Sequence, residues 1–366
     1  MEDHLPNDYG KDAVFGEVAG VTIARHFGDS AEEYRAVRES AGIADRGDLA
    51  VLRLWGRDPV KMMQGLITND LAGAGPGRGV YAAMLTPKGR MIAELRAFVR
   101  DGPDGAEVII LMPREALAGT VEHFKKFIPP MFAKWADVSD SFGTIGAYGP
   151  NARQLLESVL GPIDLANEDD FVTHDLNGAP VLAVRTHYAG GEEGYDVVLP
   201  KDEVDDFRSE LLQAGAAVGA RPVGFGALET LRVEAGVPRY GSELTEETIP
   251  TEAYESIGML PRAISFTKGC YTGQEVIIRI AHRGHVNRHL RGIALGDGPV
   301  PPPRTPLFNP DNSKQIGWTT TAVFSPELGE SIALAFLRRE FEPGQTVKLG
   351  DADGPAIEVR ELPFRK

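Results

Sequence analysis

Strand-like and helix-like segments alternate along this chain in two successive sets. The strand-like segments of the first set are residues 49–55, 80–85, 91–99 and 108–112, and a helix-like segment follows from residue 113. A comparable order returns after residue 140, with strand-like segments at 143–148, 181–184 and 195–199 and helix-like segments at 151–160 and 203–213. This alternation predicts an α+β fold. Because 366 residues are too many for one compact core, we expect two similar lobes.

The last part of the chain has a different pattern. From Gly292 onward it contains short strand-like runs, such as residues 317–324 and 332–336, which are separated by proline and glycine. Such a pattern is typical of a small β-barrel or jelly roll. We therefore expect an α+β region at residues 1–285, with lobes at roughly 25–140 and 141–285, and a C-terminal β-barrel domain at residues 286–366.

The first predicted helix begins near residue 30. Ser30 is expected at the N-cap, and Glu33 occupies the position of the acidic residue in a capping box. The helix is expected to end near Gly42.

The charge and cysteine content exclude several classes of protein. Lys plus Arg total 38 against 53 Asp plus Glu, a net charge of −15, which argues against binding to nucleic acid or an anionic membrane. The N-terminus lacks the apolar core of a signal peptide, and the longest aliphatic run, residues 108–112, is too short to cross a bilayer. We therefore expect a cytoplasmic protein. The single cysteine excludes an internal disulfide and a self-contained iron–sulfur or zinc site.

That cysteine, Cys270, lies in the segment Lys268-Gly-Cys-Tyr-Thr-Gly-Gln-Glu275. A cation at Lys268 would favour the thiolate form of Cys270. Glycines at positions 269 and 273 allow a ligand to approach the backbone closely, and Gln274 offers both a donor and an acceptor. The alternative is a buried structural cysteine. The polar, glycine-rich setting favours a functional thiol.

This octet resembles the signature of the YgfZ-type folate-binding proteins, a branch of the GcvT aminomethyltransferase superfamily. Further superfamily-like segments lie at residues 64–70, 86–90 and 231–236. The resemblance implies a GcvT-like fold, with two ferredoxin-like lobes around a central folate channel and a C-terminal β-barrel. It also implies tetrahydrofolate as ligand, iron–sulfur enzymes or their assembly proteins as partners, and Cys270 as the required residue, with Lys268 beside it.

The same resemblance implies a set of folate-binding residues. Residues 188–196 are similar to the superfamily segment Y-T-G-E-x-G-F-E with one added glycine, which puts Glu192 in the pterin-binding position. The residues implied at the folate site are Glu192, Arg232, Tyr81, Tyr188, Asn69 and Gln274. From spacing alone, Glu192 would read as a surface acid, Arg232 as a helix salt-bridge partner and Tyr81 as a core aromatic.

Two departures from the aminomethyltransferases bear on the function. Those enzymes have G-G-x-x-D-D-L where this chain has Ala93-Glu94, and D-x-S-H where it has Asp45-Arg46-Gly47-Asp48. Glu94 keeps a carboxylate that is one methylene longer, and such a change can misplace a proton-transfer group. The sequence therefore favours a tetrahydrofolate-binding accessory protein for the assembly or repair of iron–sulfur enzymes. The alternative is a tetrahydrofolate-dependent aminomethyltransferase or methyltransferase that uses Glu94, and folate binding without turnover stays open.

Three histidines, His282, His285 and His289, approach the spacing of one helix face. Gly284 interrupts that helix, and the arginines of the segment oppose a divalent ion. We therefore expect no metal site. The strip is either a solvated basic surface or a site for an anionic partner or the folate tail.

Overall fold

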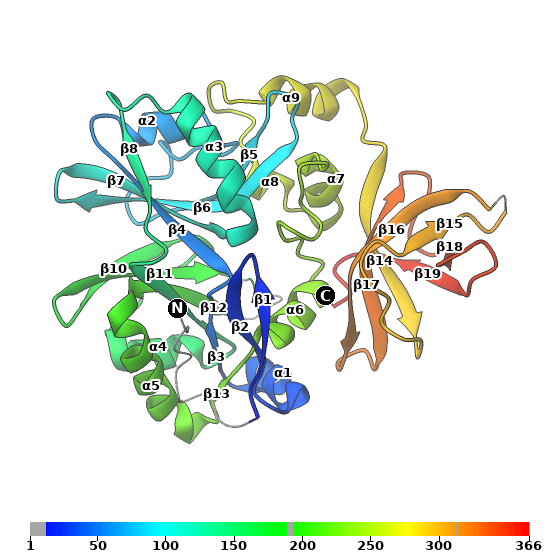
Figure 1. The fold of residues 1–366 in the computed structure, drawn as a ribbon, viewed down its shortest axis with the longest axis horizontal. Coiled ribbons are helices and arrows are strands. Elements are labelled where there is room, and N and C mark those ends of the chain that lie inside the picture. The colour runs from blue at the N-terminus through cyan, green and yellow to red at the C-terminus, as the bar shows by residue number, and fades with distance from the viewer. Residues whose placement is uncertain (1–11, 187, 189–192, 312, 366) are drawn as a thin grey trace. The chain divides into compact units, whose positions relative to one another are not determined.

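The computed structural model describes residues 12–186, 188, 193–311 and 313–365 (Figure 1). The chain forms two compact units. Unit 1 comprises residues 1–53 and 136–231, and unit 2 comprises residues 54–135 and 232–366. Each unit is thus assembled from two stretches of chain. The continuous boundaries predicted from the sequence, 1–285 and 286–366, stay a proposal.

Unit 1 is built on a six-stranded sheet of order β10-β11-β12-β9-β3-β13. Its strands are β3 (Gly42–Asp45), β9 (Phe142–Tyr148), β10 (Phe171–Leu176), β11 (Ala179–Thr186), β12 (Gly194–Pro200) and β13 (Arg221–Pro222). All neighbours are antiparallel except β3 and β13. Helices α4 (Ala152–Leu160) and α5 (Val204–Gly215) pack against β9, and the core between them contains Ile145, Leu156 and Phe207. The predicted strand–helix order after residue 140 is confirmed.

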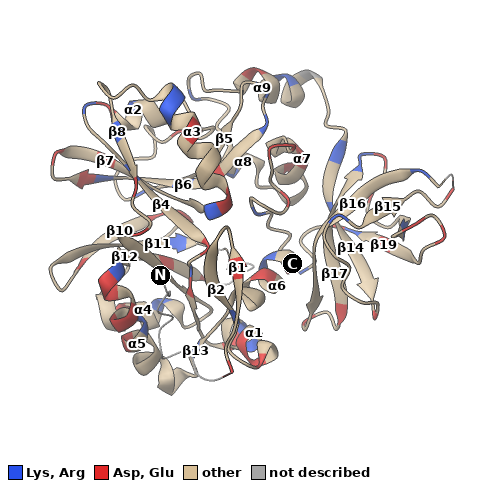
Figure 2. Cartoon of the chain, viewed as in Figure 1, with Lys and Arg blue, Asp and Glu red and all other residues tan. Residues whose placement is uncertain are grey.

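The remaining elements of unit 1 are shorter. They are the hairpin of β1 (Val14–Val18) and β2 (Val21–His26), helix α1 (Ser30–Glu39), most of helix α6 (Phe225–Glu234) and the 3-10 turns η3 (Lys201–Glu203) and η4 (Ala216–Val218). In Figure 2 the charged residues gather on helices such as α1 and α5, whereas the strands are drawn mostly in tan. The helices therefore present the polar surface and the strands form the interior.

The first part of unit 2 contains a five-stranded sheet of order β5-β6-β7-β4-β8. Its strands are β4 (Leu49–Trp55), β5 (Val80–Leu85), β6 (Met91–Gly102), β7 (Gly105–Pro113) and β8 (Lys134–Asp137). The chain passes between the two units within β4 and β8. Helix α2 (Pro59–Gln64) packs on β7, and α3 (Leu117–Phe127), which follows the 3-10 turn η2 (Arg114–Ala116), packs on β6. The predicted strands at 49–55 and 80–85 agree with the structure to the residue.

The turn between β5 and β6 requires glycine at position 89. Gly89 has a φ of 72°, and a Cβ there would lie 2.8 Å from the side chain of Val276. A larger residue would therefore meet both a strained backbone and a clash. This close approach joins the β5–β6 turn to helix α9 (Gln274–Arg283).

The second part of unit 2 contains short helices and a closed barrel. The helices before the barrel are α7 (Pro250–Tyr254), the 3-10 turn η5 (Glu255–Ile257), α8 (Leu260–Ala263) and α9. The barrel has the strand order β14-β17-β16-β15-β18-β19. Its strands are β14 (Arg288–Gly296), β15 (Pro306–Phe308), β16 (Gln315–Ser325), β17 (Glu330–Arg338), β18 (Thr346–Leu349) and β19 (Ala356–Arg360). Ile293, Leu337 and Val347 belong to the buried core of the barrel, so the predicted C-terminal barrel is confirmed.

The predicted cap of the first helix is wrong. The N-cap of α1 is Asp29, whose carboxylate accepts the N–H groups of Ala31 and Glu32. Asp29 stands one residue before Ser30 and is an equally good capping residue. Glu33 is buried instead, where it accepts N–H groups from Phe27 at 2.6 Å and Gly224 at 2.8 Å. Its role is to join three segments of unit 1.

Among the described residues, no helix is long and apolar enough to cross a membrane.

Replacing Glu33 by alanine is expected to destabilise the protein. The N–H groups of Phe27 and Gly224 would lose their acceptor, which costs about 2 kcal/mol or more. Guanidinium unfolding of the purified variant measures this loss. Glu39→Ala, an exposed glutamate of the same helix, should change the free energy of unfolding by less than about 0.5 kcal/mol. Equal effects of the two variants would show that Glu33 does not join these segments.

Candidate functional site

A buried carboxyl group lies between tyrosine side chains in unit 2. The Glu94 Oε2 atom accepts the hydroxyl of Tyr81 at 2.5 Å, and Oε1 accepts the N–H of Tyr240 at 2.6 Å. The hydroxyl groups of Tyr81 and Tyr254 are 3.0 Å apart. All three side chains are buried. We call Glu94, Tyr81 and Tyr254 the tyrosine–carboxyl cluster.

The sheet register brings two of these residues together. In the antiparallel pair of β5 and β6, Glu94 lies opposite Ala83 and Tyr81 lies opposite Arg96. Glu94 and Tyr81 are therefore diagonal neighbours on one face of the sheet, a spacing that long side chains can bridge. Tyr254 is the last residue of α7. This helix begins with Pro250, and Glu252 accepts the N–H of Ile249 at its N-terminus.

Burial controls the protonation of this cluster. It raises the pKa of Glu94 above its ordinary value, although the hydrogen bonds from Tyr81 and Tyr240 oppose this shift. Burial also raises the pKa values of Tyr81 and Tyr254 well above the ordinary range for tyrosine, and Glu94 adds to this effect. The tyrosines therefore stay neutral, while Glu94 keeps its proton to higher pH than an ordinary glutamate.

Two other predicted residues, Asn69 and Lys268, hold the main chain around this cluster through hydrogen bonds. The Asn69 side-chain amide donates to the carbonyl oxygens of Tyr81 at 2.9 Å and Arg262 at 2.6 Å. The Lys268 Nζ atom donates to the carbonyl oxygens of Gln64, Ile67 and Asn69 at 2.6, 2.8 and 2.8 Å. Arg262 in turn lies over the ring of Tyr81, 4.7 Å from its centroid. Glu94, Tyr81, Asn69 and Lys268 are thus one connected network.

Lys268 uses all its hydrogen-bond donors on the main chain. An ammonium group has three N–H donors, and each points to a carbonyl oxygen of residues 64–69. Burial lowers the pKa of Lys268 to about 8. The geometry gives Lys268 a positioning role, and its predicted action on Cys270 stays a prediction.

Cys270 and Gln274 lie in the turn that leads into helix α9. Cys270 is exposed, and Gln274 is the first residue of α9 and is half-buried. Gly273 precedes the helix with a φ of 84°, and a Cβ there would lie 2.7 Å from the carbonyl oxygen of Thr86. The glycine thus serves packing of the chain at this turn. The ligand contacts predicted for Cys270 and Gln274 stay predictions.

Arg232 is buried in a network of its own in unit 2. Its guanidinium donates to the carbonyl oxygen of Val237 at 3.0 Å, to Glu243 at 2.9 Å and to the hydroxyl of Thr321 at 2.9 Å. Glu243 also accepts the N–H of Arg239 at 3.1 Å. This network fixes the segment that carries Tyr240, whose N–H reaches Glu94. The predicted contact of Arg232 with folate stays a proposal.

The predicted pterin-binding residue, Glu192, lies outside the described residues. Its neighbour Glu193 is described and accepts hydrogen bonds from Tyr195 at 2.7 Å and Arg153 at 3.2 Å. The hydrogen bonds and the nearby arginines hold the pKa of Glu193 below its ordinary value in spite of its partial burial. Glu193 is therefore committed to local contacts. Tyr188 lies with its ring 4.2 Å from the guanidinium carbon of Arg46.

Sequence reasoning missed a second buried network, which contains Arg46. The Arg46 guanidinium pairs with both oxygens of Asp48 at 2.9 and 3.0 Å, and it donates to the hydroxyl of Tyr148 at 2.6 Å. Tyr148 donates to Asp196. The sequence signal was an arginine just before the strand-like run at residues 49–55, which is β4. Tyr254 and Tyr240 were also missed, because they meet Glu94 only through the fold.

Comparison with known proteins gives whole-chain matches. Residues 8–260 match the family described as the GCVT N-terminal domain, and residues 288–365 match the glycine cleavage T-protein C-terminal barrel domain. The chain is 30% identical to the aminomethyltransferase of Bacillus subtilis over 346 residues, covering 92% of this chain and 90% of the relative. The aminomethyltransferase of Frankia alni is 30% identical over 330 residues, which cover 90% and 87% of the two chains.

A solved structure gives the same fold. The chain superimposes on the glycine cleavage system aminomethyltransferase T from Bartonella henselae with a TM-score of 0.83, 18% identity and coverage of 96% and 94% of the two chains. The predicted GcvT-like α+β fold with a C-terminal barrel is therefore confirmed.

The predicted assignment to the YgfZ-type branch is wrong. The similar proteins are aminomethyltransferases along about 90% of the chain, whereas the octet at residues 268–275 is a short segment. The iron–sulfur role rested on that branch, and no finding supports it. Inside the octet, Lys268 has a structural use in holding residues 64–69.

Glu94→Gln is expected to become more stable than the wild type as the pH rises. The folded chain keeps a proton on Glu94 to higher pH than the unfolded chain, where glutamate titrates at about 4.3. Wild-type stability is therefore lost as the pH rises from that value through the raised pKa of the folded state. The difference in Tm between Glu94→Gln and wild type, measured from pH 4.5 to 8, should grow with pH. A difference that shrinks would contradict the raised pKa.

Lys268→Met is expected to loosen the support of the cluster. Three carbonyl oxygens would lose their donor, at a cost of about 2–4 kcal/mol. Hydrogen exchange should then increase at residues 64–69 in the variant. Lys88→Met, a substitution on the neighbouring β5–β6 turn, is the matched control and should leave exchange at residues 64–69 unchanged. Unchanged exchange in Lys268→Met would remove the positioning role.

Proposed function

We propose that this chain, which belongs to the family of the GCVT N-terminal domain and the glycine cleavage T-protein C-terminal barrel domain, is a tetrahydrofolate-dependent aminomethyltransferase or methyltransferase. The curated relatives that carry the name aminomethyltransferase support this proposal, because they match about 90% of the chain. A cytoplasmic location is part of the proposal.

The tyrosine–carboxyl cluster is the observation that carries this proposal. Transfer of the one-carbon unit from an aminomethyl carrier thiol to tetrahydrofolate breaks a carbon–sulfur and a carbon–nitrogen bond and forms two carbon–nitrogen bonds to folate. The two protons that the folate nitrogens lose go to the departing amine and to the released thiolate. Tetrahydrofolate, when bound, supplies the nitrogen atoms that accept the one-carbon unit. Because the pKa of Glu94 is raised, more of this carboxyl is protonated at neutral pH than of an ordinary glutamate. We assign the proton transfer to Glu94.

The described residues fit a folate ligand in the chemistry of their side chains. Tyr81 offers an aromatic ring, and Arg262 offers a cation beside it. These are the groups that a flat ring system and a glutamate tail require. We propose that Tyr81 contacts folate directly and that Asn69 positions it. Folate contacts from Glu192, Tyr188, Arg232 and Gln274 are part of the same proposal.

The longer carboxyl side chain at position 94 suits its surroundings. The two oxygens of Glu94 satisfy two separate donors, the Tyr81 hydroxyl and the Tyr240 N–H. An aspartate at this position would be one methylene shorter and would lose one of these contacts. The glutamate that replaces the aspartate of aminomethyltransferases therefore fits the two donors around it.

Removing the titratable group at position 94 is expected to abolish one-carbon transfer. We expect Glu94→Gln to lower kcat by about 100-fold or more, and Glu94→Asp by about tenfold, because the carboxyl is displaced. The KM for tetrahydrofolate should change less than about threefold. The assay follows the formation of methylenetetrahydrofolate and ammonia from an aminomethyl-lipoyl carrier. Methylamine donors test the methyltransferase alternative.

Two variants control this experiment. Glu122→Gln alters an exposed glutamate of α3 and should keep full activity. Cys270→Ser should also keep transferase activity, because the proposed proton transfer does not use the thiol. Full activity in Glu94→Gln would refute the assignment of Glu94. Tetrahydrofolate binding without turnover from any of these donors would refute the transferase.

A further inference from the structure

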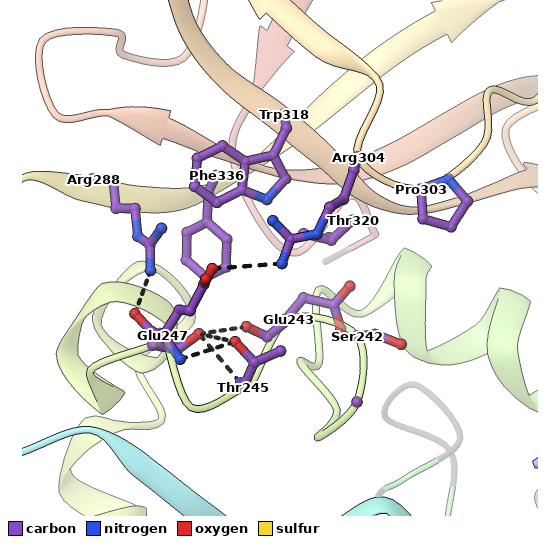
Figure 3. A pocket seen from close by; sticks show the side chains of 12 residues that line it. Ser242, Glu243, Thr245, Glu247, Arg288, Pro303, Arg304, Trp318, Thr320 and Phe336 are labelled. Carbon is purple, nitrogen blue, oxygen red and sulfur yellow. Dashed lines mark hydrogen bonds and ion pairs between the residues drawn. The ribbon is translucent and has the colours of Figure 1, made fainter. Parts of the chain in front are cut away.

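A small cavity in unit 2 lies apart from the tyrosine–carboxyl cluster. It has a volume of about 150 Å³. One wall is the loop of residues 241–248, and the other wall is formed by the barrel residues Arg288, Arg304, Trp318 and Phe336 (Figure 3). A cavity of this size holds about one six-membered ring.

Two arginines lie against the aromatic wall of the cavity. The guanidinium carbon of Arg288 is 5.0 Å from the centroid of the Trp318 ring and 4.8 Å from that of Phe336. The guanidinium carbon of Arg304 is 5.9 Å from the Trp318 centroid. Figure 3 shows both guanidinium groups beside the indole ring, at the edge of the cavity. The lining also contains two carboxylates, Glu243, which is paired with Arg232, and Glu247, which is paired with Arg304. A flat, negatively charged ligand would therefore have to displace Glu247 from Arg304.

Arg288 is held rigidly and keeps an unused donor. Its NH2 group donates to the carbonyl oxygen of Glu247 at 2.7 Å and to Glu252 at 3.0 Å. The side chain is 18% exposed. Its Nε–H is buried and has no hydrogen-bond partner among the described residues. This atom has almost no accessible surface, so the contact of Arg288 with a ligand in the cavity falls to the rest of its guanidinium group.

Arg304 is held by its backbone but is only loosely paired through its side chain. Its φ is 63°, a conformation that non-glycine residues adopt at a cost. The N–H of Arg304 donates to the carbonyl oxygen of Thr319 at 2.8 Å, which fixes this conformation. The guanidinium lies 3.5 Å from Glu247, and both side chains are about two-thirds exposed. Such a solvent-exposed pair is weak and can be exchanged for another carboxylate.

We propose that this cavity binds a small carboxylate with a flat ring. The ring occupies the cavity against Trp318, and the carboxylate takes the place of Glu247 as the partner of Arg304. Arg288 adds a second cation at the cavity wall. The site contains no residue of the tyrosine–carboxyl cluster, so the proposal stands independently of the transferase activity.

Sodium benzoate is the probe that tests this site. Calorimetric titration of the full chain at constant ionic strength should show saturable binding of benzoate. Benzyl alcohol, which has the ring without the charge, should bind at least about tenfold more weakly. Trp318→Leu and Arg304→Gln should each weaken benzoate binding by about tenfold or more. Arg339→Gln, a nearby exposed arginine, is the matched control and should change binding less than about twofold.

A variant that binds benzoate more tightly cannot owe this change to a loss of folding. Glu247→Gln removes the carboxylate that competes for Arg304, so benzoate should bind about threefold or more tightly. No saturable benzoate binding to the wild type, or equal losses in Arg304→Gln and Arg339→Gln, would overturn the proposal. Binding of hexaglutamate without binding of benzoate would also overturn it, since the occupant would then be an acidic polypeptide.

Discussion

The hydrogen bonds to the buried carboxyl of Glu94 are the interactions on which the site in unit 2 depends. A carboxyl group loses its hydration when it is buried, and it must recover hydrogen bonds from the protein. Glu94 recovers them from Tyr81 on the neighbouring strand and from Tyr240 in a later segment. Arg232 and Glu243 hold that segment in place. Burial of one ionisable group thus accounts both for the hydrogen bonds that order this region and for the raised pKa of Glu94.

Local patterns predicted those parts of the fold that local interactions determine. The strands at residues 49–55 and 80–85 were predicted to the residue, because apolar runs and the turn at Gly89 mark their ends. The partners of Glu94 could not be predicted in this way. Tyr254 is 173 residues from Tyr81, and Tyr240 is 146 residues from Glu94. No sequence period connects such positions. The cap of α1 was misplaced because Asp29 and Ser30 are both good capping residues.

The error over the family branch has a similar origin. The octet around Cys270 suggested a reactive thiol with an activating cation. In the fold, the ammonium group of Lys268 directs its three donors to main-chain oxygens, and one of these belongs to Asn69, which supports Tyr81. Lys268 thus has a positioning role, which its place two residues before Cys270 in the sequence did not indicate. Similarity along the whole chain identified the family more reliably than the short motif did.

The protonation of Glu94 is the central claim, and infrared spectroscopy measures it directly. The difference spectrum between wild type and Glu94→Gln, recorded in D₂O from pH 4 to 8, isolates the carbonyl stretch of this one protonated carboxyl group. The raised pKa predicts that this band persists above about pH 4.3, the ordinary pKa of glutamate. A band that disappears at or below that value would show that Glu94 is an ordinary carboxylate, and it would contradict the account.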